Sequence, residues 1–336
     1  MLVESVPNVS EGRRLDVVER LADALTAGDG VFLLDRTSDA SHNRSVFTIA
    51  GDDDAVAMAL ERLVEQAIDD IDMGRHQGEH PRIGAVDVVP FVPLGSTTMA
   101  DCVELARSFG ARIAGRHGIP VYLYAQAATR ADRVKLADVR RGQYEGLKAE
   151  ITTNGRQPDF GPTRMHPRAG AVAVGARPFL IAWNINLDSD DVDLAKRIAR
   201  RVRESGGGLP RLQANGFRVE EPDRGHAVRA QVSMNLLDSA VTPLWRAWET
   251  VRELAAEDGV PLAESELIGL APLAALLDVA DHAGVDVSLP VEDRLKAAAD
   301  AIRLRDFSPL MALELRLRAS QEASTRAARE ADRDRA

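Results

Sequence analysis

The chain has 336 residues, of which 45% are hydrophobic and 28% are charged, and its formal net charge is -10. This composition is typical of a folded globular protein rather than a disordered or fibrous one, and the length suggests two domains. So acidic a chain is not expected to bind nucleic acid or an anionic membrane over a broad surface, because such binding needs a basic face. Any anionic ligand must therefore be held by a local cluster of basic residues.

The first part of the chain alternates apolar, β-branched runs with helical periods, which predict strands and helices respectively. The predicted strands are residues 2–9, 31–34, 44–50 and 86–92, and the predicted helices are residues 13–27 and 52–71. A turn-rich segment, SDASHN, separates the second and third strands. The order is β-α-β-β-α-β, the arrangement of a ferredoxin-like fold.

The same order recurs from residue 178 onward. Here the predicted strands are residues 179–187, 212–219, 228–236 and 266–270, and the predicted helices are residues 188–203, 242–257 and 273–283. We therefore predict an α+β protein with two ferredoxin-like βαββαβ α/β-sandwich subdomains. Their expected bounds are residues 1–177 and 178–300, and residues 301–336 form a charged tail that is either helical or disordered.

A different segment joins the two predicted βαββαβ units. It contains a predicted helix at residues 99–115, a strand at residues 121–124 and a helical piece at residues 144–151. Residues 154–175 follow, are punctuated by glycine and proline, and are too many for an ordinary connection. This stretch is either a disordered linker or a ligand-binding loop.

The cellular compartment is indicated by cysteine usage and by the N-terminal sequence. Cys102 is the single cysteine, so the chain forms neither an internal disulfide nor a site of several thiolates. The N-terminal residues lack the pattern of a signal peptide, and no segment approaches the roughly 18 apolar residues of a membrane span. We expect a cytoplasmic protein that binds neither membrane nor nucleic acid.

The segment MGRHQGEHPRIGA, residues 73–85, concentrates reactive side chains between a predicted helix and a predicted strand. Its string HQGEH matches a zinc-binding H-x-x-E-H pattern. Gly78 and Pro81 oppose the helix that would place both histidines on one face, so we predict no metal site. His76 and His80 are each compatible with a hydrogen-bonded structural role, but a histidine before a proline is well placed for acid-base chemistry.

Two other segments have both a structural and a functional interpretation. Ser10 follows the first strand and is either a helix N-cap or part of a functional segment, and Asn8 can aim its amide at a ligand. Arg164, His166 and Arg168 form either an anion-binding rim or a solvated basic loop. No phosphate-binding or dinucleotide-binding glycine motif is present.

These segments, together with others along the chain, resemble the glutamate formimidoyltransferase family, a folate-dependent transferase that is fused to a cyclodeaminase in animals. The resemblance covers roughly residues 2–300. It rests on VPNVSEG (6–12), NRSVFT (43–48), DMGRHQGEHPRIGAVDVVPF (72–91), PVYLY (120–124), PDFGP (158–162), GARPFLIAWNINL (175–187), AQVSMNLLD (230–238) and LIGLAPLAALLD (267–278).

The resemblance implies transfer of the formimino group from N-formimino-L-glutamate to N5 of tetrahydrofolate, giving 5-formiminotetrahydrofolate and L-glutamate. This reaction belongs to histidine degradation and one-carbon metabolism. The resemblance also implies tetrahydrofolate as co-substrate, no metal, a homodimer, and folate binding in a cleft between the subdomains. Since this chain has no cyclodeaminase segment, we expect no channelling to a fused partner within it.

The resemblance also assigns residues. It implies that the histidine of the GEHPR string, His80, is the general acid or base. It implies that the loop after DFGP, which here carries extra basic residues, binds folate. That loop comprises Gly161, Pro162, Thr163, Arg164, Met165, His166, Pro167, Arg168, Ala169 and Gly170.

The chemistry of the implied reaction suggests further residues. The attacking amine loses a proton and the departing nitrogen gains one, and a single imidazole can do both in turn. A carboxylate would favour the protonated formimino group, and Asp35 and Asp39 are the candidates. The carboxylates of both substrates need cationic or amide partners, for which the candidates are Arg44, Arg82, Arg164, Arg168 and Asn8.

Two other functions stay open at this point. One is a related folate enzyme that acts on 5-formyltetrahydrofolate or on formylglutamate. The other is a non-catalytic folate-binding sensor, which would bind folate without transferring a group and would not need a rigid His-Pro turn.

Overall fold

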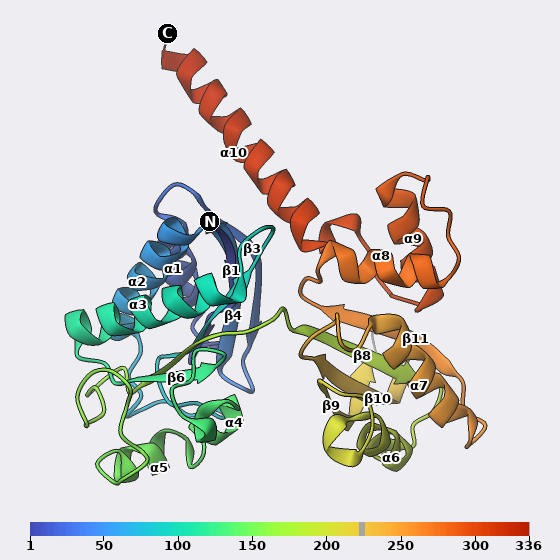
Figure 1. Ribbon diagram of the computed structural model, residues 1–336, viewed down its shortest axis with the longest axis horizontal. Helices are drawn as coiled ribbons and strands as arrows, with labels where there is room; N and C mark the ends of the chain where they lie inside the picture. Colours follow the sequence, from blue (N-terminus) through green and yellow to red (C-terminus); the bar gives the residue numbers. More distant parts are fainter. Residues whose placement is uncertain (222–225, 336) are drawn as a thin grey trace. The chain divides into compact units, whose positions relative to one another are not determined.

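The computed structural model describes residues 1–221 and 226–335. The chain divides into two compact units, Met1–Pro178 and Phe179–Ala336. Each unit has its own β-sheet, its own helices and its own buried core (Figure 1). The prediction of an α+β protein is confirmed.

The first unit contains a seven-stranded sheet. Its strands are β1 (Leu2–Ser5), β2 (Asn8–Val9), β3 (Val31–Asp39), β4 (Arg44–Asp52), β5 (Val86–Pro93), β6 (Val121–Ala125) and β7 (Val172–Ala176). β3 pairs with β4, β4 with both β1 and β2, these two with β5, and all of these pairs are antiparallel. β5, β7 and β6 follow in parallel pairing.

Two strand predictions in this sheet differ from the structure. The run at residues 2–9 is divided into β1 and β2, because Pro7 has no N–H to pair and instead its carbonyl accepts from Phe47 N at 3.1 Å. The strand predicted at residues 31–34 continues to Asp39, so the turn between β3 and β4 is only residues 40–43.

Helices cover both faces of this sheet in unequal measure. α1 (Leu15–Thr26), α2 (Asp53–Asp70) and α3 (Met99–His117) enclose the main core on one face. α4 (Leu136–Val139) and α5 (Gln143–Glu150) close a smaller cluster on the other face (Figure 1). Alternate residues of a strand point to opposite faces, so Leu123 of β6 enters the main core whereas Tyr122 and Tyr124 enter the smaller cluster.

The ends of the helices depend on local chemistry. Thr98 and Asp101 form a capping box at the start of α3, and Gly118, with φ of 64°, ends it. The N-cap interpretation of Ser10 is wrong, because α1 begins only at Leu15 and Ser10 Oγ donates to Gly84 O at 2.7 Å. Ser10 therefore holds the end of β2 against the segment before β5.

The second unit contains a four-stranded antiparallel sheet in the order β11-β8-β10-β9. Its strands are β8 (Ile181–Leu187), β9 (Leu212–Glu221), β10 (His226–Leu236) and β11 (Leu262–Ile268). Its helices are α6 (Val192–Val202), α7 (Leu244–Ala256), α8 (Leu273–His282), α9 (Val291–Ala301) and α10 (Leu313–Arg335). Trp183 of β8 is fully buried, 6.2 Å from the Trp248 ring of α7.

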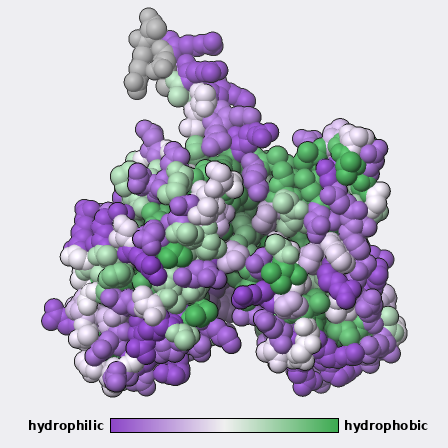
Figure 2. Space-filling model, viewed as in Figure 1, coloured by the Kyte–Doolittle hydropathy of each residue, from purple (hydrophilic) through white to green (hydrophobic). Residues whose placement is uncertain are grey.

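The second core extends beyond the predicted boundary at residue 300. Ile302, Leu304 and Ala312 are buried in it, and Leu313 and Leu317 are also buried. The exposed charged segment therefore begins within α10, where the side chains from Gln321 to Glu330 are all exposed. Figure 2 shows the hydrophilic surface along this helix. Within the described residues, no helix is long and apolar enough to cross a membrane.

We expect Leu194→Ala, in α6, to lower the free energy of unfolding of the second unit by about 2 to 5 kcal/mol, because it leaves a cavity at a buried position. All three tryptophans lie in this unit, so urea unfolding followed by tryptophan fluorescence measures it selectively. Lys196→Ala, at an exposed position of the same helix, is the control and should change the value by less than about 0.5 kcal/mol. Equal stability of the two variants would contradict the packing described for α6.

Candidate active site

His80 lies half-buried in the loop between α2 and β5, and its Nε2 is 2.5 Å from Arg44 Nη1. Because a guanidinium only donates, Nε2 accepts this hydrogen bond, and the neutral ring carries its proton on Nδ1. Burial, together with the positive charges of Arg44 and Arg140, lowers the pKa of His80 to about 3. The imidazole is therefore neutral at physiological pH.

Two guanidinium groups share the space beside His80. Arg44 begins β4, and its pKa is lowered by burial and by Arg140, whereas Asp87 and Asp39 oppose that shift. Arg140, at the end of α4, forms a short ion pair with the buried Asp87, whose other oxygen accepts from Ile83 N at 2.7 Å. The carboxylate of Asp87 thus neutralises one guanidinium, and Arg44 retains its charge next to the imidazole.

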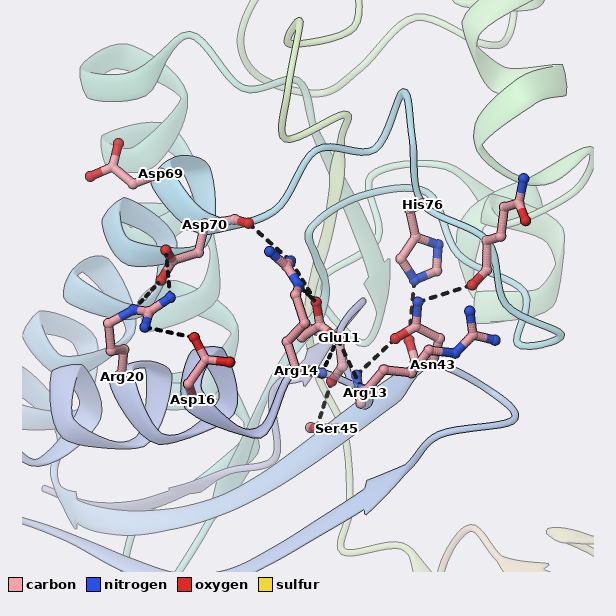
Figure 3. Close-up of polar contacts among 12 residues, drawn as sticks. Glu11, Arg13, Arg14, Asp16, Arg20, Asn43, Ser45, Asp69, Asp70 and His76 are labelled. Atoms are coloured by element: carbon pink, nitrogen blue, oxygen red, sulfur yellow. Dashed lines mark hydrogen bonds and ion pairs between the residues drawn. The ribbon is translucent and has the colours of Figure 1, made fainter.

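Asn43 joins three segments around this cluster (Figure 3). Its Oδ1 accepts from Gly12 N at 2.9 Å, its Nδ2 donates to Gln77 O at 2.9 Å, and its carbonyl accepts from His76 Nε2 at 3.1 Å. Its φ of 48° is in the left-handed region, which asparagine tolerates better than most residues. Sequence reasoning missed Asn43, although an asparagine in a turn just before a strand was an available signal.

Two glycines allow these segments to approach one another. A Cβ on Gly78 would lie 2.4 Å from His42 O, and a Cβ on Gly12 would lie 2.4 Å from Asp39 O. Both contacts are with backbone atoms, which cannot move aside as a flexible side chain can. The loop that carries His80 therefore lies directly against the turn between β3 and β4.

Arg82 anchors the His80 loop to α5. Its Nε donates to His76 Nδ1 at 3.2 Å, its Nη1 to Gln143 Oε1 and Glu145 Oε2, and its Nη2 to Glu145 Oε1 at 2.8 Å and His76 O. All five N–H groups of this buried guanidinium thus have protein acceptors. His76 uses both ring nitrogens in the same network. In this structure both residues hold the loop, and Arg82 has no N–H left for a substrate.

Asp39 uses its carboxylate within its own turn. Oδ1 accepts from Ser41 N, Ser41 Oγ and His42 N, and Oδ2 is 2.7 Å from His42 Nδ1. The hydrogen bonds from Ser41 and His42 hold the pKa of Asp39 well below its usual range. Asp35 lies half-buried on the same strand, opposite Thr48 of β4.

Asn8 occupies β2 between Val46 of β4 and Val88 of β5, with its side chain half-buried. Its Nδ2 donates to Val6 O at 3.1 Å. This hydrogen bond is local to the break between β1 and β2.

The loop of residues 161–170 is folded and is not a disordered linker. His166 and Gly170 exchange backbone hydrogen bonds of 2.9 and 3.1 Å, and His166 Nδ1 accepts from Ala169 N at 2.9 Å. Arg168 donates to Ile68 O and Asp69 O at the end of α2, so it caps that helix. Met165 packs against the core and Ala169 is buried in it, whereas Gly161, Thr163, Arg164, Pro167 and Arg168 are exposed.

Comparison with known proteins shows the family of the chain. Residues 2–177 match the formiminotransferase domain, N-terminal subdomain, and residues 182–312 match the formiminotransferase domain. The chain belongs to the glutamate formimidoyltransferase family. Both matched segments correspond closely to the two units of the structure.

Several relatives cover most of the chain. It is 47% identical to the glutamate formimidoyltransferase of Streptococcus pyogenes serotype M1, over 84% of this chain and 92% of that protein. It is 45% identical to the glutamate formimidoyltransferase of Thermoplasma acidophilum, over 89% of this chain and 99% of that protein. The formimidoyltransferase-cyclodeaminase of Sus scrofa is 44% identical over 83% of this chain, which matches 52% of that longer protein.

In the present structure, a cleft of about 490 Å³ is lined in part by Asn43 and His76, whose positions Figure 3 shows. Four arginines line it, Arg13, Arg14, Arg75 and Arg168, together with the acidic residues Glu11, Asp70 and Asp72. Glu11 is buried, and its two carboxylate oxygens accept hydrogen bonds from Arg14 N and Arg14 Nε. The side chain of Arg75, in contrast, is 90% exposed. The cleft thus joins arginines of the His80 segment and of the 161–170 loop.

No group of three or more histidine, cysteine, aspartate or glutamate residues that could hold a metal ion occurs in residues 1–221 and 226–335.

We expect Arg44→Gln to raise the pKa of His80 by at least about one unit, because the change removes a positive charge 2.5 Å from the imidazole. The measurement is a pH titration of the His80 ring signals by NMR. Arg36→Gln is the control, since Arg36 pairs with Glu19 and is not among the residues that shift the pKa of His80. An unchanged pKa in the Arg44 variant would contradict a contribution of Arg44 to the shift.

Proposed function

We propose that this protein transfers the formimino group from N-formimino-L-glutamate to N5 of tetrahydrofolate, giving 5-formiminotetrahydrofolate and L-glutamate. Tetrahydrofolate is the co-substrate, and the reaction belongs to histidine degradation and one-carbon metabolism. The observation that carries this proposal is that both units match the formiminotransferase domains. The neutral imidazole beside a charged guanidinium is consistent with acid-base chemistry on anionic substrates.

We assign the role of general acid or base to His80. The amine at N5 must lose a proton as it attacks the formimino carbon, and a neutral imidazole accepts one. In the structure Arg44 donates a hydrogen bond to His80 Nε2, the atom that would accept the proton from N5. Binding of a substrate carboxylate by Arg44 would release Nε2 and raise the pKa of His80, because the carboxylate offsets the guanidinium charge.

The remaining contacts with substrate are also proposals. The exposed part of the 161–170 loop, including Arg164, would contact the folate, and the arginine-lined cleft would hold carboxylates. Asp35 and Asp39 would stabilise the protonated formimino group, and Asn8 would contribute its amide oxygen, which the hydrogen bond to Val6 leaves available.

We further propose that each unit is a ferredoxin-like subdomain and that the chain acts as a homodimer in the cytoplasm. Support for the first point comes from strand order. In the second unit, β11-β8-β10-β9 places the fourth, first, third and second strands of a βαββαβ sequence side by side. The single cysteine, Cys102, is buried and free, which fits a reducing compartment such as the cytoplasm.

The test is to mix formiminoglutamate with tetrahydrofolate and the protein, acidify, and follow the methenyl folate by absorbance. We expect the wild-type protein to form product and His80→Ala to lower kcat by about 10²- to 10⁴-fold. Folate affinity should stay within a few-fold, because the imidazole acts on protons rather than on binding. Absence of product from the wild type would overturn the function, and full turnover by the variant would overturn only the assignment of His80.

We also expect Gly78→Ala to lower kcat by at least about tenfold, because a Cβ there would lie 2.4 Å from His42 O and displace the His80 loop. Gly115→Ala is a matched control: it lies in α3, where a Cβ meets no atom within 4 Å. Circular dichroism of both variants tests whether they fold. A folded Gly78 variant with normal turnover would show that the close approach is not needed for transfer.

A further inference from the structure

The turn between β3 and β4 holds a second imidazole beside the site. His42 Nδ1 is 2.7 Å from Asp39 Oδ2, and the histidine side chain is 49% exposed. Asp39 Oδ1 accepts from Ser41 N, Ser41 Oγ and His42 N, so the carboxylate is fixed in place. A fixed carboxylate keeps the proton of the ring on Nδ1 and leaves Nε2 as the atom that exchanges protons.

This imidazole is held close to His80. The two ring centroids are 6.5 Å apart, with an angle of 68° between the ring planes. Asn43 ties the turn to Gln77, and Gly78 lies against His42 O, so the backbone segments that carry the two rings are held together. The packing of two segments therefore brings the pair together, and the contact with Asp39 orients the His42 ring.

The proposed reaction needs two proton transfers of opposite direction. One proton leaves N5 as it attacks, and another reaches the glutamate nitrogen as it departs. His80 has its Nε2 hydrogen-bonded to Arg44, and an imidazole with so low a pKa holds a proton only weakly. Such an imidazole is a weak base, and a second imidazole that contacts Asp39 through Nδ1, and not through Nε2, can carry out one of the two transfers.

We propose that His42, oriented by Asp39, is a second proton-transfer residue of this site and protonates the departing glutamate nitrogen. This inference rests on the proposed function. It adds to His80 a residue that the sequence motifs did not single out. Asp39 then acts mainly as a positioning residue for His42.

The proton and electron balance closes without another reactant. As N5 bonds to the formimino carbon, its proton passes to His80. The bond from that carbon to the glutamate nitrogen then breaks, the electron pair stays on the nitrogen, and the nitrogen takes a proton from Nε2 of His42, which enters the step as an imidazolium with a second proton on Nδ1. Before the next turnover His80 releases its proton to water and the half-exposed His42 takes one from water, so no net proton is gained or lost.

The charges that face this pair come from several elements. Asp39 lies on β3, Arg44 on β4, Arg140 at the end of α4 and Asp87 on β5. Arg82 also acts on His80, so three guanidinium groups and two carboxylates face the imidazoles, and gain of one proton by the pair adds positive charge to the cluster. Any pH profile of turnover reports the pair together with these groups.

The test compares His42→Ala with the wild type in the acidification assay. We expect kcat to fall by about 10²- to 10⁴-fold, while the KM for tetrahydrofolate stays within about threefold. Added imidazole should restore part of kcat, because the vacated position is half exposed and admits it. Asp39→Asn should lower kcat by less than His42→Ala, because it removes the orienting charge and not the imidazole.

His282→Ala is the matched control, since it removes an exposed histidine from α8 of the second unit and should leave kcat unchanged. A His42→Ala turnover within about threefold of the wild type would overturn the inference and leave the proposed function intact. So would a reduced turnover that imidazole does not relieve, because that result indicates a structural role. An inactive wild type would overturn the proposed function itself, and this inference with it.

Discussion

The arrangement of the site depends on one contact, the seating of the turn between β3 and β4 against the loop that carries His80. Asn43 makes this contact through hydrogen bonds with Gly12, Gln77 and His76. Gly12 and Gly78 allow the backbones to approach closely. Each group is buried or half-buried, so loss of one partner would leave polar backbone atoms without hydrogen bonds. The positions of Arg44 on one side of Asn43 and His42 on the other follow from this seating.

The same seating brings like charges together, which costs free energy and explains the electrostatics of the site. Arg44 and Arg140 approach each other beside a half-buried imidazole, and only Asp87 and Asp39 offset them. A protein with a net charge of -10 thereby keeps a local cationic region on an otherwise repelling surface. The substrates of the proposed reaction are anions, so their binding would relieve the repulsion between the guanidinium groups of Arg44 and Arg140.

Much of this could be predicted from sequence, because strand and helix periods and the GEHPR string are local signals. The order of elements followed from periodicity, and the resemblance singled out His80. The roles of Arg82, Ser10 and Arg168 could not be predicted, since each depends on acceptors distant in the chain: Glu145, Gly84 and the end of α2. A charged or hydroxyl side chain has the same appearance in a sequence whether it binds substrate or anchors a loop.

Arg44 has a position that couples substrate binding to proton transfer. In the structure its guanidinium occupies His80 Nε2, which keeps the imidazole neutral but blocks the atom that would accept a proton. A carboxylate that draws Arg44 away would free that atom and strengthen its basicity in the same event, because charge and hydrogen bond leave together. The base would then become competent only when an anionic substrate is bound. In that account the low pKa of His80 lasts only until an anion binds Arg44, and the second imidazole, His42, carries the other of the two proton transfers.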